Sequence, residues 1–311
     1  MENKALLVVN PKAGTGMNGN SLIKLLEAAD EIPGLEIHLI KKGENIIELV
    51  QKAVKQGVTV VGAAGGDGTI NAVATALVGQ NVPLVVIPFG TLNHFARDID
   101  IPKEPVAALA LFDSASSREI KVDVGTVNNH IFLNNSSIGL YPRLVAAREI
   151  RQKKDNMKKW PAYLLAGWYV LRHPQPARVR VALGKADPAQ TMKVGLIFIA
   201  NNKVEMSPLR AGKRLVLDGK LLDIYIFKVT SSFPLFRLAA AFLRNKLEAS
   251  PTVDNLQTES IRLNFNRQRV RVACDGEVFT LRPPLDYQIQ PSGLTLRVLL
   301  PDEPQDVNEK H

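Results

Sequence analysis

The sequence predicts an N-terminal doubly wound α/β domain followed by a C-terminal antiparallel β-sandwich domain. Three observations support this fold class. A chain of 311 residues with 46% hydrophobic residues can bury two separate cores. Short apolar runs alternate with helical patterns over about the first 115 residues. From about residue 118 the pattern changes to strands in which apolar and polar residues alternate.

In the N-terminal part, four short runs rich in β-branched residues have the composition of parallel strands that are buried on both faces. They are residues 4–10, 35–40, 57–62 and 82–88. Apolar residues at helical spacing lie between them and beyond them, around 22–29, 46–54, 69–79 and 104–112. This alternation predicts an open parallel sheet with helices on both faces.

In the C-terminal part, each strand is predicted to have one buried apolar face and one solvent-exposed polar face. The alternation is clearest at residues 178–181, 261–265 and 269–272. Two helical inserts interrupt it. The first, about 143–172, is basic and then aromatic, and the second runs from Phe233 to Leu247.

Composition limits the function classes. Cys274 is the only cysteine, which excludes an intrachain disulfide and a cysteine-based zinc cluster. No secretory signal pattern and no apolar run of roughly 18 to 20 residues is present, so a cytoplasmic location is expected. A net charge of +9 favours anionic partners such as nucleotide phosphates, an acidic membrane surface or nucleic acid.

Three glycine-containing loops are predicted at the carboxyl ends of strands in the first domain. They are Asn10–Gly16, Gly65–Thr69 and Pro88–His94. In an open α/β sheet such loops bind ligands, and glycines let backbone N–H groups approach phosphate oxygens at a helix N-terminus. Each loop also has a structural reading. The first can be an ordinary connection, and in the second Asp67 or Thr69 can simply cap a helix. Their convergence on one rim favours phosphate binding.

A second candidate lies far downstream, at Asp275-Gly276-Glu277. Asp-Gly between two alternating strands is typical of a hairpin turn and needs no function. The functional alternative is that Glu277 acts as a general base toward an attacking hydroxyl. Its neighbour Cys274 is interpreted as a buried strand residue rather than a nucleophile.

Four segments together resemble the bacterial diacylglycerol kinase and lipid kinase family, whose catalytic domain is also found in sphingosine kinases. They are VVNPKAGTG at 8–16, GGDGTINAVATAL at 65–77, PFGTLNHFARDI at 88–99 and CDGE at 274–277. The resemblance implies a first domain like the nucleotide domains of NAD kinases and phosphofructokinases, and a second domain that is a β-sandwich. It also implies that a final strand, 292–301, returns to the first domain. The predicted domains are therefore 1–125, with that strand, and 126–291.

The resemblance implies an ATP-dependent enzyme that uses Mg²⁺. The residues predicted to bind ATP are Asn10, Pro11, Lys12, Ala13 and Gly14 in the first loop, Gly65, Gly66, Asp67, Gly68, Thr69, Ile70 and Asn71 in the second, and Thr91 and Asn93 in the third. By the same resemblance Glu277 is the proton acceptor, and Asp67 helps to hold the magnesium of the nucleotide. Asp67 is also the second candidate for the catalytic proton acceptor. A structural magnesium is expected at Asp218 and at the backbone of Leu215 and Lys220. One departure stands at 39–42, where relatives often have a threonine that contacts ATP and this chain has Leu-Ile-Lys-Lys.

The predicted reaction is transfer of the γ-phosphate of ATP to a hydroxyl of a membrane lipid, with diacylglycerol as the first choice and phosphatidate as its product. The alternatives are another lipid alcohol, such as a sphingoid base or phosphatidylglycerol, then NAD kinase activity, then a non-catalytic lipid- or nucleotide-binding module. Peripheral contact with an anionic membrane at its inner face is expected, through the basic and aromatic residues of 143–172. Nucleic acid is not an expected partner, because no motif supports it. A homodimer is left open.

Overall fold

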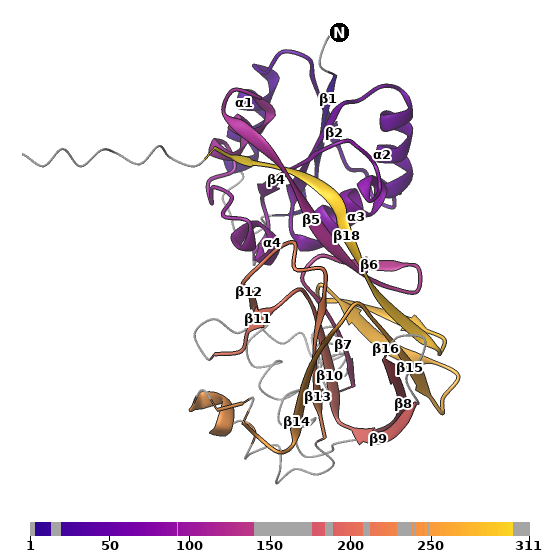
Figure 1. Cartoon of the computed structure of the whole chain (residues 1–311). Coiled ribbons are helices and arrows are strands. Elements are labelled where there is room, and N and C mark those ends of the chain that lie inside the picture. The colour runs from indigo at the N-terminus through magenta and orange to yellow at the C-terminus, as the bar shows by residue number, and fades with distance from the viewer. Residues whose placement is uncertain are drawn as a thin grey trace, which may run out of the picture. The chain divides into compact units, whose positions relative to one another are not determined.

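The computed structural model describes residues 4–13, 20–91, 93–139, 176–183, 189–207, 212–228, 238, 240–244, 246–247 and 249–300 (Figure 1). The chain divides into two compact units. The first comprises Met1–Lys121 and Leu294–His311, and the second comprises Val122–Gly293. The predicted fold class is confirmed: a parallel sheet with helices forms the first unit, and antiparallel sheets form the second.

The sheet of the first unit has the strand order β2-β1-β3-β4-β18. Its strands are β1 (Ala5–Val9), β2 (Leu35–Leu39), β3 (Val60–Gly65), β4 (Leu84–Pro88) and the C-terminal part of β18 (Leu285–Leu299). All of these pairs are parallel. β3 and β4 are buried along their whole length, as expected for strands covered on both faces.

The third strand begins three residues later than the predicted run 57–62. Gly57 has a positive φ of 93°, and Thr59 bonds to Lys4 outside the strand. Pairing with β1 then carries β3 on through small residues to Gly65. These residues have low strand propensity, so tertiary pairing overrides the local preference.

The helices of the first unit are α1 (Asn20–Asp30), α2 (Ile46–Lys55), α3 (Asp67–Leu77) and α4 (His94–Asp98). α2 packs against α3 on one side of the sheet, and α1 lies on the other (Figure 1). The helix predicted at 104–112 is instead a short 3₁₀ helix, Ala107–Phe112. Pro105 lacks an N–H and disfavours helical geometry in the residue before it, which delays the start of the helix.

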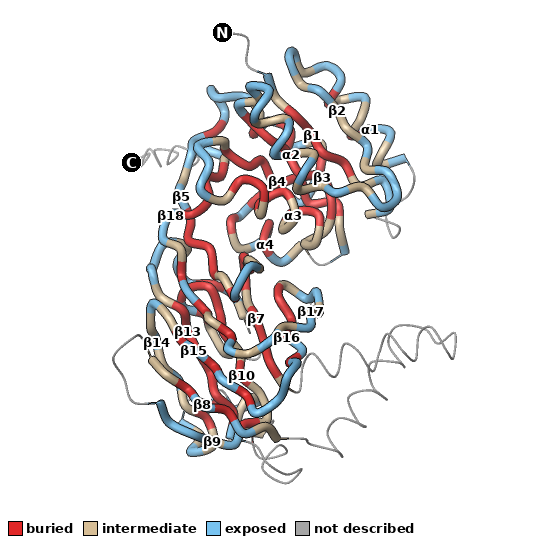
Figure 2. Tube along the Cα trace, turned by 90° about the vertical axis from the view of Figure 1, so that its right-hand side faces the viewer, coloured by how far each residue is buried: buried red, intermediate tan, exposed pale blue. Residues whose placement is uncertain are grey.

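The second unit contains two antiparallel sheets that share one core. One sheet has the order β14-β13-β10-β7-β16-β17, and the other joins β18 to β15, β8 and β9, with β5 and β6 alongside. Inward side chains from both sheets, such as Ile199 and Leu263, form this core. The buried residues follow the strands of the sheets in Figure 2. The strand bounds are β5 Ser117–Val127, β6 His130–Phe132, β7 Asn135–Gly139, β8 Ala177–Leu183, β9 Gln190–Val194, β10 Leu196–Asn201, β11 Val204–Glu205, β12 Lys213–Arg214, β13 Leu222–Phe227, β14 Val253–Thr258, β15 Ser260–Phe265, β16 Val270–Cys274 and β17 Glu277–Leu281.

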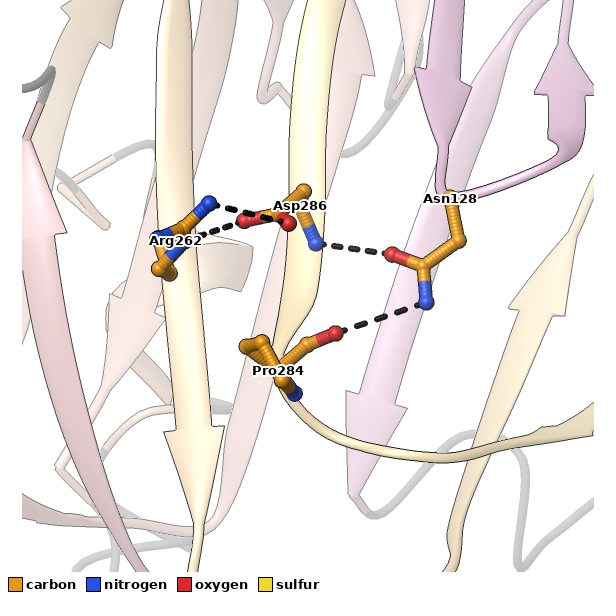
Figure 3. Close-up of polar contacts among 4 residues, drawn as sticks. All are labelled: Asn128, Arg262, Pro284 and Asp286. Atoms are coloured by element: carbon orange, nitrogen blue, oxygen red, sulfur yellow. Dashed lines mark hydrogen bonds and ion pairs between the residues drawn. The ribbon is translucent and has the colours of Figure 1, made fainter.

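A polar network fixes the turn after β5 to the start of β18 (Figure 3). The Asn128 side chain accepts a hydrogen bond from the Asp286 N–H at 2.9 Å and donates one to the Pro284 carbonyl at 3.4 Å. Arg262 of β15 binds both carboxylate oxygens of Asp286. Three strands of this sheet are thereby held in register at one end.

The insert at 143–172 lies outside the described residues. Of the second predicted insert, residues 238 and 240–243 are helical, and Leu238 and Leu247 pack into a small second cluster with Tyr225 and Phe227. Within the part of the chain that the structure describes, no helix has the length and apolar character needed to cross a bilayer.

Candidate active site

The three glycine-containing loops leave neighbouring parallel strands at the same edge of the first unit's sheet. Val9 of β1 pairs with Ala64 of β3, and Gly65 of β3 pairs with Pro88 of β4. Residues 10–13, 66–71 and 89–93 therefore start from one rim, as parallel strands require. Gly14 lies outside the described residues.

Glycines are required where the second and third loops approach each other. A Cβ added to Gly90 would lie 2.4 Å from the Cα of Gly66, and one added to Gly65 would lie 2.5 Å from the Cβ of Thr69. The Phe89 N–H donates to the Gly65 carbonyl at 3.0 Å. The obstacle is backbone at Gly90 and the Thr69 side chain at Gly65, so only glycine fits at either position.

Helix α3 begins directly after Gly66, and no side chain caps it. The first N–H groups of an α-helix have no partner within the helix, and they carry the positive end of its dipole. In this loop they lie at the carboxyl edge of the sheet, beside the glycines. This arrangement suits an anion such as a phosphate group.

Side chains of the predicted site cross-link the loops. Asn10 donates to the Thr69 hydroxyl at 3.1 Å and accepts from the Lys12 N–H at 3.1 Å. Asp67 accepts from the Phe95 N–H at 3.3 Å. These bonds tie the first loop and the start of α4 to the first turn of α3, so Asn10, Thr69 and Asp67 position the backbone of the rim.

The remaining predicted nucleotide residues differ in accessibility. Pro11, Lys12 and Thr91 are exposed, and Ala13, Gly68 and Asn71 are half-buried. Ile70 is fully buried, so its side chain belongs to the core beneath the rim. Asn93, at a positive φ of 47°, forms two 2.9 Å hydrogen bonds with the backbone of Gly90 and closes the third loop.

In the second unit, the Asp-Gly pair forms the predicted hairpin turn. Cys274 of β16 pairs with Glu277 of β17, and both turn residues have a positive φ, 46° for Asp275 and 89° for Gly276. This is the geometry of a two-residue hairpin whose turn matches the strand twist. The turn reading and the catalytic reading of this segment are therefore compatible.

Asp275 has a role that sequence reasoning missed. Its carboxylate accepts hydrogen bonds from three consecutive backbone N–H groups, those of Leu133 at 2.7 Å, Asn134 at 2.8 Å and Asn135 at 3.1 Å. Its own N–H donates to the Asn135 carbonyl at 2.9 Å. The hairpin is thus fastened to the segment that leads into β7. The only feature of the sequence that hinted at this anchoring role was an acidic residue at the first position of the turn.

Glu277 is exposed as the first residue of β17. Neighbouring groups nevertheless displace water around its carboxyl, and this loss of solvation, with the negative charge of Asp275, raises the pKa of Glu277. A raised pKa makes the carboxylate a better proton acceptor. Cys274 is buried, burial raises the pKa of its thiol to about 12, and its interpretation as a strand residue is confirmed.

The segment predicted to bind a structural magnesium is the loop between β12 and β13. Asp218 is exposed. Lys220 has a positive φ of 58°, and its N–H donates a hydrogen bond to the buried Asp123 carboxylate at 2.6 Å. Asp123 also accepts from the Ser292 N–H, and its own N–H donates to the Leu217 carbonyl. Asp123 therefore shapes this loop, a role not predicted from the sequence.

The loop fits a hard cation by its oxygen chemistry. The Asn202 side-chain oxygen is fully buried and has no hydrogen-bond partner among the residues that the structure describes, and a Cβ on Gly219 would lie 2.9 Å from it. An orphaned amide oxygen is costly unless a donor, a water or a cation satisfies it. Among the described residues no three His, Cys, Asp or Glu side chains cluster as a metal site. Backbone carbonyls would have to supply most of the ligands.

Residues 4–127 match the model of the diacylglycerol kinase catalytic domain. Over these residues the chain is similar to that catalytic domain. A probable lipid kinase YegS-like protein of Pseudomonas aeruginosa is 35% identical over 173 residues, and that match covers 53% of this chain and 53% of the relative. The chain thus spans about half the length of this relative. A diacylglycerol kinase of Bacillus subtilis is 27% identical over 286 residues, which cover 90% of this chain and 91% of the relative.

Solved structures have a similar fold. A diacylglycerol kinase from Bacillus anthracis has a TM-score of 0.66 at 21% identity, with 96% of this chain and 98% of that chain covered. A further structure from the same organism gives a TM-score of 0.71 at 23% identity and the same coverage. At this level of identity the likeness concerns the fold.

Proposed function

We propose that the chain is an ATP-dependent lipid kinase that transfers the γ-phosphate of ATP to a hydroxyl of a membrane lipid, with diacylglycerol as acceptor and phosphatidate as product. The observation that carries the proposal is the rim of the first unit. There, glycines with no room for a Cβ bring two loops together beside the uncapped start of α3. The family match and the names of the relatives support the reaction class.

The nucleotide would be held mainly by main-chain N–H groups. Phosphoryl transfer asks a protein chiefly to position the reactants and to stabilise charge on the transferred group. The first turn of α3 after Gly66 supplies donors, and Asn10 and Asp67 keep the neighbouring loops in place. Asp67 would also hold the Mg²⁺ of the nucleotide, which supplies charge neutralisation on the phosphates.

In the proposed transfer step, Glu277 accepts the proton of the attacking lipid hydroxyl. The lipid hydroxyl oxygen forms a bond to the γ-phosphorus, the bond from that phosphorus to the β–γ bridging oxygen breaks, and ADP leaves with the electron pair. The hydroxyl proton passes to the Glu277 carboxylate. The raised pKa of Glu277 supports this role because it brings the acceptor closer to the pH at which the enzyme works.

The loop at 215–220 would hold a structural Mg²⁺ through the Asp218 carboxylate and the carbonyls of Leu215 and Lys220. The unpartnered oxygen of Asn202 beside Gly219 supports a cation in this loop. The ion would stiffen the loop that Asp123 already fastens through the Lys220 N–H.

A lipid acceptor requires that the enzyme work at a bilayer surface. The proposal therefore places the protein in the cytoplasm, bound peripherally at the inner face of the membrane. The positive net charge of +9 supports attraction to an anionic leaflet.

The test is transfer of labelled γ-phosphate from ATP to a panel of lipids that contains diacylglycerol, a sphingoid base and phosphatidylglycerol, with mass spectrometry of each product. Labelled phosphatidate is the expected product. A different labelled lipid would correct the acceptor while it preserved the reaction. Hydrolysis of ATP, or label only in a soluble acceptor such as NAD, would overturn the assignment.

A further inference from the structure

The outward face of the sheet formed by β9, β8 and β15 is strongly basic. Arg178 and Arg180 of β8 and Lys193 of β9 are exposed, while Val179 between the two arginines is fully buried. These three residues are called the basic face below. β8 and β9 lie side by side, and their outward residues are exposed in Figure 2.

The basic face contains two like charges in direct opposition. Arg178 pairs across the strands with Lys193, and Arg180 pairs with Thr191 on one side and Asn264 on the other. Like charges directly opposite each other destabilise a sheet. No acidic residue occurs in β8, β9 or β15, so nothing within these described strands offsets the repulsion.

A basic residue of the same face that does have a partner provides the contrast. Arg262 of β15 binds both carboxylate oxygens of Asp286 on β18, which pairs with it directly. Among the residues that the structure describes, no ion pair involves any member of the basic face. Arg267 and Arg269, in the turn after β15, add charge of the same sign.

The strands that carry the basic face are rigidly held from behind. Val179, Val181 and Val194 belong to the main core of the second unit, and Leu263 and Phe265 of β15 pack beside them. The charged side chains therefore stand on a fixed surface, although their long stems remain adjustable. A flat and adjustable cationic surface fits many separate anionic groups better than it fits one small ligand.

We propose that the basic face docks the enzyme on the anionic lipid headgroups of the membrane that contains its acceptor. This inference rests on the proposed lipid kinase function, and it assigns a surface for the membrane contact. The charge complementarity is direct, because cations that have no ion-pair partner among the described residues stand opposite each other on neighbouring strands. Anionic headgroups relieve that repulsion. Basic residues near an anionic leaflet each strengthen binding by about a factor of five.

The test uses sedimentation with vesicles of phosphatidylcholine that contain increasing fractions of phosphatidylglycerol. Wild-type binding should rise with the anionic fraction and fall with added salt, because salt screens exposed charges. Neutralisation of the three residues in the variant R178Q/R180Q/K193Q should weaken binding to anionic vesicles by roughly 100-fold. Binding of this variant at the wild-type level would overturn the proposal, and so would wild-type binding that ignores the anionic fraction.

A matched control variant tests whether vesicle binding depends on the basic face or only on the net charge of the protein. K24Q/K103Q/K121Q removes the same charge from exposed positions of the first unit. It should bind vesicles like the wild type, and an equal loss of binding would show that only net charge matters and would overturn the proposal. Thermal unfolding of all variants checks that the sheet remains folded.

Activity distinguishes this proposal from the proposed function. With diacylglycerol dispersed in neutral detergent, R178Q/R180Q/K193Q should phosphorylate at the wild-type rate, because the basic face takes no part in the chemistry. A different result would separate the two proposals. If the wild-type protein phosphorylates no lipid, but R178Q/R180Q/K193Q binds anionic vesicles more weakly than the wild type, the lipid kinase assignment fails and the docking surface stands.

Discussion

Replacement of Asp275 by alanine should destabilise the second unit strongly. The Asp275 carboxylate accepts three backbone hydrogen bonds, at 2.7, 2.8 and 3.1 Å. A hydrogen bond to a charged group contributes about 1.5–3 kcal/mol, and a buried N–H without a partner costs about 1–3 kcal/mol. Leu133 and Asn134 are buried, so their N–H groups would lose both protein and water partners. Since such contributions are not additive, we expect a loss of about 4 kcal/mol.

The assay is urea unfolding followed by circular dichroism and by tryptophan fluorescence. Asp275→Asn is the matched variant, because its amide retains one acceptor oxygen but presents an NH₂ group where the other carboxylate oxygen accepts. It should lose less stability than the alanine variant and more than Glu277→Gln, which leaves the anchor intact. If Asp275→Ala unfolded within about 1 kcal/mol of the wild type, the anchoring role inferred from these contacts would be refuted.

Three further predictions concern the rim, the cation loop and the pH dependence. Gly90→Ala places a Cβ against the backbone of Gly66, which cannot move aside cheaply, so it should weaken ATP binding in calorimetry at least about tenfold, and wild-type affinity in this variant would contradict the role of the rim. Asn202→Ala should reduce the rise in Tm that Mg²⁺ gives the wild-type protein, and an unchanged rise would exclude Asn202 from the cation loop. Turnover should fall as the pH drops through the raised pKa of Glu277, because protonation removes the acceptor, and a rate independent of acid pH would contradict that role.

The fold was predictable wherever burial follows a simple period. Runs such as β4 are apolar throughout and form fully buried parallel strands, and the alternation at Val179 and Val181 gives one buried and one exposed face. The end of β3 was not predictable, because Ala63 and Ala64 enter the strand through pairing with β1 rather than through their own propensity.

Some residues of the candidate site could also be predicted from the sequence, and others could not. The glycines at 65 and 90 could be found because positions with no room for a Cβ leave a residue-type signature. The roles of Asp123 and Asp275 could not, since each carboxylate receives backbone N–H groups from segments far away in the chain. Such partners depend on tertiary structure, and a single acidic residue in a strand or turn carries no local pattern that reveals them.

The basic face could be recognised only by combining the sequence with the structure. The sequence shows Arg178 and Arg180 as polar residues of an alternating strand, which is the ordinary pattern of a solvated face. Only the strand register places Lys193 directly opposite Arg178, and only the contacts show that Arg262 has an ion-pair partner while Arg178, Arg180 and Lys193 have none among the described residues. The unusual feature is the arrangement of the charges rather than their number.

The account depends most on a division of labour between a rim that binds ATP and a carboxylate that accepts the proton. Measurement of both the turnover with diacylglycerol and the Kd for ATP in the Glu277→Gln variant tests it directly. The amide keeps the size of the side chain but cannot take a proton, so turnover should fall by at least about 100-fold while ATP binds as tightly as in the wild type. Wild-type turnover in this variant would contradict the central claim.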